Sequence, residues 1–112
     1  MPIANCIITS DCHKRSGESS ELITLWAIES NKSPEDMTIN IIASDEQYGK
    51  KYSVMAHLLL PSIWSGSDIS QLQLGLAKAL TLHFHLSLEE VFIATSIVNS
   101  GMVVEEGEEI EW

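Results

Sequence analysis

Hydrophobic positions along the chain follow two patterns, continuous apolar runs and stripes at helical spacing. Ile3 to Thr9 is a continuous run rich in β-branched residues, which predicts a buried strand. Between Glu18 and Ser30, apolar residues recur three and four positions apart, which predicts an amphipathic helix. Pro34 breaks the helical pattern, and Met37 to Ala43 is predicted as a second strand.

The order strand, helix, strand then occurs a second time. Tyr52 to Leu60 is predicted as a strand that ends before a proline. A helix follows, capped by Ser67 or Asp68 and running to about His83. Val91 to Val98 is predicted as the fourth strand.

The two halves match each other at an offset of 54 residues, which places Leu22 opposite Leu76 on the two predicted helices. Ser33 and Ser87 each begin an acidic turn, S-x-E-[DE], that leads into a strand and in which the serine can cap free N–H groups. A strand, helix, strand unit joins parallel strands by a right-handed crossover. The repeat therefore predicts an α+β fold: tandem β-α-β units in a four-stranded mixed sheet, with two helices on one face. The other face is bare and apolar, which calls for a partner subunit.

Composition and charge narrow the range of possible functions. With 45% hydrophobic and 20% charged residues the chain is predicted to be globular, and 112 residues suit one domain. A net charge of −10 with Arg15 as the single arginine argues against binding to nucleic acid or to an acidic membrane. Five glutamates lie in the tail from Asn99 to Trp112, which is predicted to form a short hairpin or to lie on a neighbouring chain.

Targeting and cysteine usage point to the cytoplasm. No apolar stretch approaches the roughly 20 residues that span a bilayer, and the N-terminus does not resemble a signal peptide. Cys6 and Cys12 match no metal or redox motif, so we expect reduced thiols and no bound metal. His83 and His85, two residues apart near a helix end, are predicted to be structural.

Pro2 is the first candidate for chemistry. It follows the initiator methionine, so removal of Met1 would leave it as a secondary amine at the N-terminus. Terminal amines titrate near about 8, and burial favours the neutral form. A neutral amine held on a strand is a good general base. Alternatively, the proline simply tolerates a chain end, and a retained Met1 would make its nitrogen an amide without basicity.

The run Pro2 to Ile8 resembles the opening of the 4-oxalocrotonate tautomerase family, and the doubled unit resembles its macrophage migration inhibitory factor branch. Lys32 stands in a K-x-P turn after the first helix, as in that branch, and Val91 to Ala94 aligns with its late strand. The resemblance implies one tautomerase-like domain over 1–112, with pseudo-repeats at about 2–44 and 52–98 and a tail at 99–112.

The same resemblance implies a homotrimer with Pro2 at the base of a pocket shared between subunits. Its reaction would be the cofactor-free keto–enol tautomerisation of a small α-keto or 2-hydroxy-enoic acid, with Pro2 as general base. The substrate-binding residues it suggests are Lys32, Arg15, Asn40, Leu60 and Phe92.

The chain also departs from each branch. Phe92 and Ala94 replace a tyrosine and an asparagine of the late strand, and only Arg15 lies near an arginine position of the 4-oxalocrotonate branch. Glu105 follows Ala94 by eleven residues, a spacing similar to that of the water-activating glutamate of the cis-3-chloroacrylic acid dehalogenases. Glu105 is therefore a second catalytic candidate, in a hydrolytic enzyme that also uses Pro2. The missing residues leave open a catalytically inactive binding or regulatory protein.

Each candidate has a simpler alternative. Lys32 can complement the dipole at a helix end without touching a substrate. Arg15 can clamp a carboxylate through two hydrogen bonds or remain an exposed loop residue. Glu105 can belong to a solvated acidic run.

Overall fold

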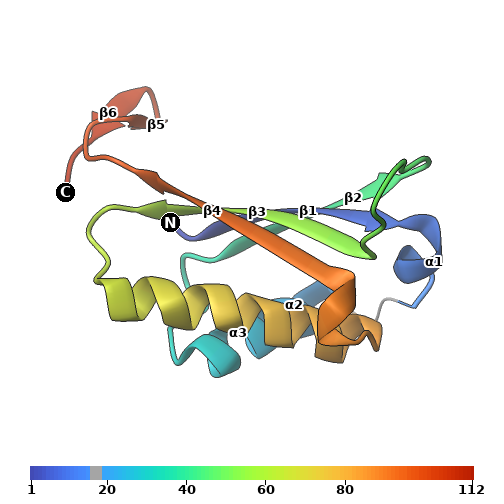
Figure 1. The fold of residues 1–112 in the computed structure, drawn as a ribbon. Coiled ribbons are helices and arrows are strands. Elements are labelled where there is room, and N and C mark those ends of the chain that lie inside the picture. Colours follow the sequence, from blue (N-terminus) through green and yellow to red (C-terminus); the bar gives the residue numbers. More distant parts are fainter. Residues whose placement is uncertain (16–18) are drawn as a thin grey trace.

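The computed structural model describes residues 1–15 and 19–112 (Figure 1). Its elements, in chain order, are β1 (Ile3–Thr9), α1 (Ser10–His13), α2 (Ser19–Ser30), β2 (Thr38–Ser44), β3 (Val54–Pro61), α3 (Gly66–Phe84), the 3₁₀ turn η1 (Leu88–Glu90), β4 (Val91–Val98), β5 (Val103–Glu105) and β6 (Glu108–Ile110). The strands β1 and β4 have the predicted bounds. The strands β2 and β3 begin one and two residues later than predicted, and the predicted helix start at Glu18 lies outside the described residues.

Four strands form one mixed sheet in the order β2-β1-β3-β4. β1 is parallel to β2, β3 is parallel to β4, and the two central strands are antiparallel with Ile3 opposite Leu59. Both long helices, α2 and α3, cover the same face of the sheet (Figure 1). The predicted α+β architecture of two β-α-β units is therefore confirmed.

The core lies between the sheet and the two long helices. Alternate residues of β1 and β3 point into it and are almost fully buried, among them Cys6 and Leu58. Trp26 of α2 is fully buried, and its indole N–H donates to the carbonyl of Leu72 in α3 at 3.1 Å. This hydrogen bond lets a large side chain with one polar atom fill the core without leaving that atom unpaired.

The two helices approach each other closely at one glycine. Gly75 lies in the middle of α3, and a Cβ added there would lie 2.8 Å from the backbone nitrogen of Ser30 in α2. Glycine is unfavourable inside a helix by about 1 kcal/mol relative to alanine. Its presence here is explained by the backbone of Ser30, which leaves no room for a side chain.

Of two polar turns, one differs in detail from the prediction and the other agrees with it. The N-cap of α3 is Ser65 rather than Ser67 or Asp68: Asp68 N donates to Ser65 Oγ at 3.1 Å, and Ser65 N donates to Asp68 Oδ2 at 3.3 Å. This reciprocal pair is a capping box, in which Asp68 is the third helical residue and not the cap. At Ser33 the hydroxyl accepts from the N–H of Glu35 at 3.2 Å, as the acidic turn predicts.

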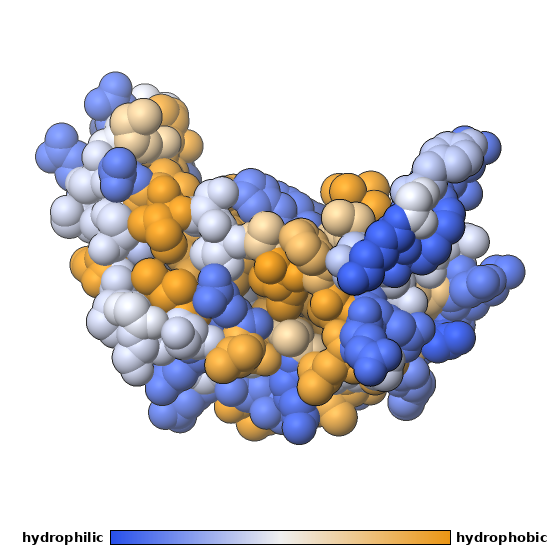
Figure 2. Space-filling view, in the orientation of Figure 1, coloured by the Kyte–Doolittle hydropathy of each residue, from blue (hydrophilic) through white to orange (hydrophobic). Residues whose placement is uncertain are grey.

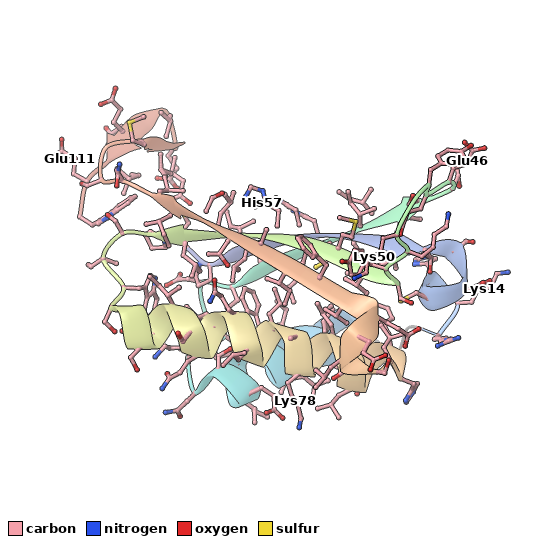
Figure 3. The ribbon with its side chains drawn as sticks, in the orientation of Figure 1. Lys14, Glu46, Lys50, His57, Lys78 and Glu111 are labelled. Carbon is pink, nitrogen blue, oxygen red and sulfur yellow. The ribbon has the colours of Figure 1, made fainter. Side chains whose placement is uncertain are left out.

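The face of the sheet that α2 and α3 leave open carries rows of side chains across the strands. One row is apolar and partly exposed: Ile42, Ile7, Met55 and Phe92. The next row begins with Asn40, whose amide N–H donates to Asn5 Oδ1 at 2.7 Å, and continues with His57. His57 projects away from the helices (Figure 3) and lies 2.7 Å from Ser96 Oγ. The predicted bare face is present, although a polar row interrupts it.

The tail forms the predicted hairpin from β5 and β6, separate from the main sheet. Glu106 and Gly107 make its turn with φ of 53° and 80°, the conformation of a tight two-residue hairpin turn. Trp112 is held by a hydrogen bond from its indole N–H to Ser62 Oγ at 2.9 Å. This hairpin and the loop between β2 and β3 project from the molecule, and the surface between them is hollowed (Figure 2). In the described part of the chain, no helix is long and apolar enough to cross a membrane.

Candidate active site

Pro2 is buried at the start of β1. Its carbonyl accepts a hydrogen bond from Thr38 N at 3.0 Å, which fixes it to the first residue of β2. On the other side it lies one residue beyond the pair Ile3–Leu59 that joins β1 to β3. Pro2 is thus held by the central strand of a sheet, at the edge where β3 ends and α3 begins (Figure 1).

A cavity of about 290 Å³ is lined by the two sequence neighbours of Pro2, Met1 and Ile3, while Pro2 itself is not among the residues that line it. The turn before β2 supplies Asp36, and Glu105 comes from β5. The hairpin therefore returns to the N-terminal edge of the sheet and brings its first glutamate to the residues that flank Pro2. The fold thus brings Met1 and Glu105, which are more than 100 positions apart in the sequence, to the lining of one cavity.

Lys32 is at the end of α2 and interacts with the first turns of α3. Its Nζ lies 2.6 Å from Asp68 Oδ1 and 3.0 Å from Gln71 Oε1, and 5.5 Å from the centre of the Trp64 ring. The hydrogen bond from Lys32 lowers the pKa of the Asp68 carboxyl, with a further contribution from Ser65. Lys32 is therefore engaged by an ion pair at the edge of the sheet that holds Pro2.

Arg15 lies at the other end of β1 from Pro2. It borders a cavity of about 520 Å³ together with Cys12, Lys51 and Glu90 among others. The seven residues of β1 separate this cavity from Pro2 by roughly 20 Å at the usual rise of a strand. Within one chain the structure does not bring Arg15 to Pro2.

The three remaining predicted residues lie on different sides of the sheet. Asn40 and Phe92 are on the open face, where Phe92 packs against Tyr52 with ring centres 5.3 Å apart. Leu60 is fully buried in the core, on the side of the helices. Its parity on β3 turns it toward α3, and its contact with a substrate remains a prediction.

No sequence pattern indicated a role in the site for Asp36 or Asp68. Asp36 is the last acid of the turn that begins at Ser33, and only the fold shows that it faces the cavity. Asp68 was considered as a cap, and the spacing of Ser65 and Asp68 is the sequence signal for its capping box. Its ion pair with Lys32 joins residues 36 positions apart, which no local pattern could indicate.

The two histidines have structural surroundings. His83 is 5% exposed and packs edge-on against Phe84, and burial lowers its pKa. His85 is the left-handed C-cap of α3. Among the residues that the structure describes, no group of three His, Cys, Asp or Glu side chains could hold a metal ion.

Comparison with known proteins identifies the fold. No protein-family model and no curated protein matches the sequence. Among solved structures, a native fused 4-OT matches with a TM-score of 0.74 at 6% identity, over 96% of this chain and 94% of the other. N1, a member of the cis-3-chloroacrylic acid dehalogenase family, matches with 0.72 at 12% identity, over 96% and 82%. Macrophage migration inhibitory factor from Oncomelania hupensis matches with 0.72 at 12% identity, over 99% and 82%.

These three structures all belong to the tautomerase superfamily, and the chain has their fold over nearly its whole length. More particularly, it has the doubled form of that fold, in which one chain carries two β-α-β units.

Proposed function

We propose that the protein is a cofactor-free keto–enol tautomerase in which Pro2, freed by removal of Met1, is the general base. The observation that carries the proposal is the placement of Pro2: it is buried, fixed by Thr38, and lies between two residues that line a cavity. The amine would take a proton from the carbon next to a carbonyl group and return it to the oxygen of the resulting enolate. The reverse transfer converts the enol to the ketone, so no electron acceptor is needed.

Two opposing effects act on a Pro2 amine in this site. Burial favours the neutral form, which a general base requires. The carboxylates of Asp36 and Glu105 in the adjoining cavity favour the ammonium form. In this proposal Pro2 supplies the base for the reaction. The charge that a substrate can carry depends on Lys32 and on these two acids.

The proposal includes a homotrimer. The open face of the sheet carries the apolar row Ile42, Ile7, Met55 and Phe92, and burying such a row requires another chain. Two fused 4-OT structures with this fold are described as trimers, one symmetric and one asymmetric. In such an assembly Arg15 would reach a Pro2 site only from another subunit.

Glu105 supports a second candidate, the addition of water to an activated double bond. In that reaction Glu105 would take a proton from water, and the ammonium form of Pro2 would give a proton to the substrate carbon. The position of Glu105 in the cavity beside Pro2 favours this candidate. Both candidates need a free amine at Pro2, and they differ in their need for Glu105.

Intact mass of the natively expressed protein comes first, because full retention of Met1 would exclude both candidates and favour a binding or regulatory protein. If Met1 is removed, tautomerisation of phenylpyruvate and of 2-hydroxymuconate is followed by ultraviolet absorbance. Pro2→Ala should lower kcat/KM by about 100-fold or more, the usual contribution of a general base. Glu105→Gln should retain tautomerase activity, whereas it should abolish a hydration reaction. Equal rates for wild type and Pro2→Ala would refute the role of Pro2.

A further inference from the structure

Lys32 is held in place from three sides. Asp68 pairs with its Nζ at 2.6 Å, Gln71 accepts a second hydrogen bond at 3.0 Å, and the Trp64 ring lies beneath it. The Lys32 side chain is only 16% exposed. A substrate carboxylate would therefore have to share this lysine with Asp68, which already neutralises its charge.

Asp68 is itself fixed by the helix that carries it. Its Oδ2 accepts hydrogen bonds from the N–H of Ser65 at 3.3 Å and from the hydroxyl of Ser65 at 2.7 Å. Its other oxygen, Oδ1, is the one that binds Lys32. Because both oxygens are engaged, the carboxylate cannot rotate away from Lys32 without breaking the cap of α3.

The cavity beside Pro2 offers no replacement for this cation. Of the described side chains that line it, the two charged ones are acids, Asp36 and Glu105. Carboxylates in a small cavity repel an anion and leave a neutral carbonyl compound unaffected. The charge at this edge of the sheet therefore disfavours an acidic substrate twice, through the paired lysine and through the acids of the cavity.

Building on the proposed tautomerase, we infer that the Pro2 site takes uncharged carbonyl compounds, and that Asp68 determines this specificity by neutralising Lys32. Asp68 is a positioning residue: it acts through Lys32 and need not touch the substrate. This substrate class differs from the α-keto or 2-hydroxy-enoic acid that the sequence resemblance implies. The difference comes from a residue on α3 that is remote in sequence from the K-x-P turn.

The test compares phenylpyruvate with its methyl ester, which has the same carbon skeleton without the charge. Wild type should have the higher kcat/KM for the ester. In Asp68→Asn the amide oxygen can still accept from Ser65, while the charge on Lys32 is no longer neutralised. The acid-to-ester ratio of kcat/KM should then rise roughly tenfold, mainly through a lower KM for the acid, as expected for a new charged hydrogen bond.

Three further variants isolate the cause. Asp68→Glu restores a carboxylate and should return the ratio toward that of wild type. The double variant Asp68→Asn with Lys32→Met should remove the gain, because the gain depends on the lysine. Asp45→Asn makes the same change of charge at an exposed loop position and should leave the ratio unchanged. Because the ratio is measured within one protein sample, partial unfolding of a variant does not alter it.

The outcomes separate the two proposals. If the acid is the better substrate of wild type, or Asp68→Asn leaves the ratio unchanged, the inference about charge is wrong while a Pro2-dependent activity still stands. If neither compound is converted in a Pro2-dependent reaction, the proposed function itself fails.

Discussion

Gly75 of α3 faces the backbone of Ser30 in α2 so closely that no side chain fits between them. A Cβ at position 75 would lie 2.8 Å from Ser30 N and 2.9 Å from Ser30 Cα. Backbone atoms cannot move aside as the end of a flexible side chain can. The packing of the two helices against the sheet therefore depends on the absence of one methyl group.

Gly75→Ala is expected to destabilise the protein by about 1–3 kcal/mol, because overpacking the helix contact costs more than the gain in helix propensity. Urea unfolding followed by circular dichroism measures the change. Gly66→Ala is the matched control: it lies in the first turn of α3, and a Cβ there meets nothing within 4 Å. Equal stability of the two variants would contradict the close approach at Ser30.

The Glu90 carboxylate should make stability depend on pH. It accepts hydrogen bonds from Ser87 N at 2.9 Å and from Ser53 Oγ at 3.0 Å, and these, the backbone bond first, lower its pKa below the ordinary 4.5. A carboxylate with a lowered folded-state pKa stabilises the fold above the unfolded-state pKa, and this is lost as pH falls through the folded-state value. Glu90→Gln should therefore destabilise the protein near neutral pH, and this effect should diminish as pH falls through the lowered pKa of Glu90.

Urea unfolding of wild type and of Glu90→Gln at several pH values, from neutral to acidic, measures this difference in stability. Glu89→Gln, at the neighbouring exposed position, is the control for a general change of charge. A Glu90→Gln effect that stays constant down to the acid limit would show that the two hydrogen bonds do not favour the ionised form.

Cys6 and Cys12 should be unreactive in the folded protein. Both thiols are buried, and burial raises the pKa of Cys6 to about 12 and that of Cys12 above its ordinary value. Only the thiolate is an effective nucleophile, so exclusion from solvent and a raised pKa act in the same direction. A thiol reagent such as Ellman's reagent should label neither residue at neutral pH and both in denaturant. Rapid labelling of Cys12 in the native state would show that the segment around α1 opens readily.

The open sheet face gives a prediction about assembly. Met55 is 37% exposed there, in the middle of the apolar row, and Leu74 is 72% exposed on α3. A lysine at either position is tolerated by an isolated chain. If trimers form through the open face, Met55→Lys should shift the protein toward monomers, since a lysine is costly to bury unpaired. Light scattering after size exclusion measures the mass, and Leu74→Lys should remain a trimer.

Periodicity predicted the architecture well because burial on one side of each element is repeated along the sequence. The 54-residue repeat correctly matched Leu22 with Leu76, and both are buried in the core. The hydrophobic pattern did not indicate α1, because the segment Ser10 to His13 is mostly polar. Its single turn is held by the Thr9 side chain and not by a hydrophobic stripe. It also placed the cap of α3 too late, since Ser65 and Ser67 are both good caps and only the partner Asp68 distinguishes them.

The site was less predictable than the fold. The catalytic roles of Pro2 and Glu105 remain predictions, although both residues were recognisable as candidates, one from its position in the sequence and the other from its spacing after Ala94. The partners of Lys32 were not, because Asp68 and Trp64 belong to the other half of the repeat. Leu60, which the resemblance suggested, lies on the buried side of its strand, and its contact with a substrate remains a prediction. Contacts between distant segments decide which candidate side chains are free to act.

The acidic hairpin also affects how fast molecules reach the cavity. Its segment carries five glutamates, and β5 brings Glu105 to the cavity itself. Charges of this kind act over a Debye length of about 30 Å in 0.01 M salt but only about 8 Å at physiological ionic strength. The arrival of anions at Pro2 would then be slow in dilute buffer and faster in salt, while that of neutral molecules stays constant. The hairpin would thus make the rate at which a molecule reaches the cavity depend on the charge of that molecule and on the salt concentration.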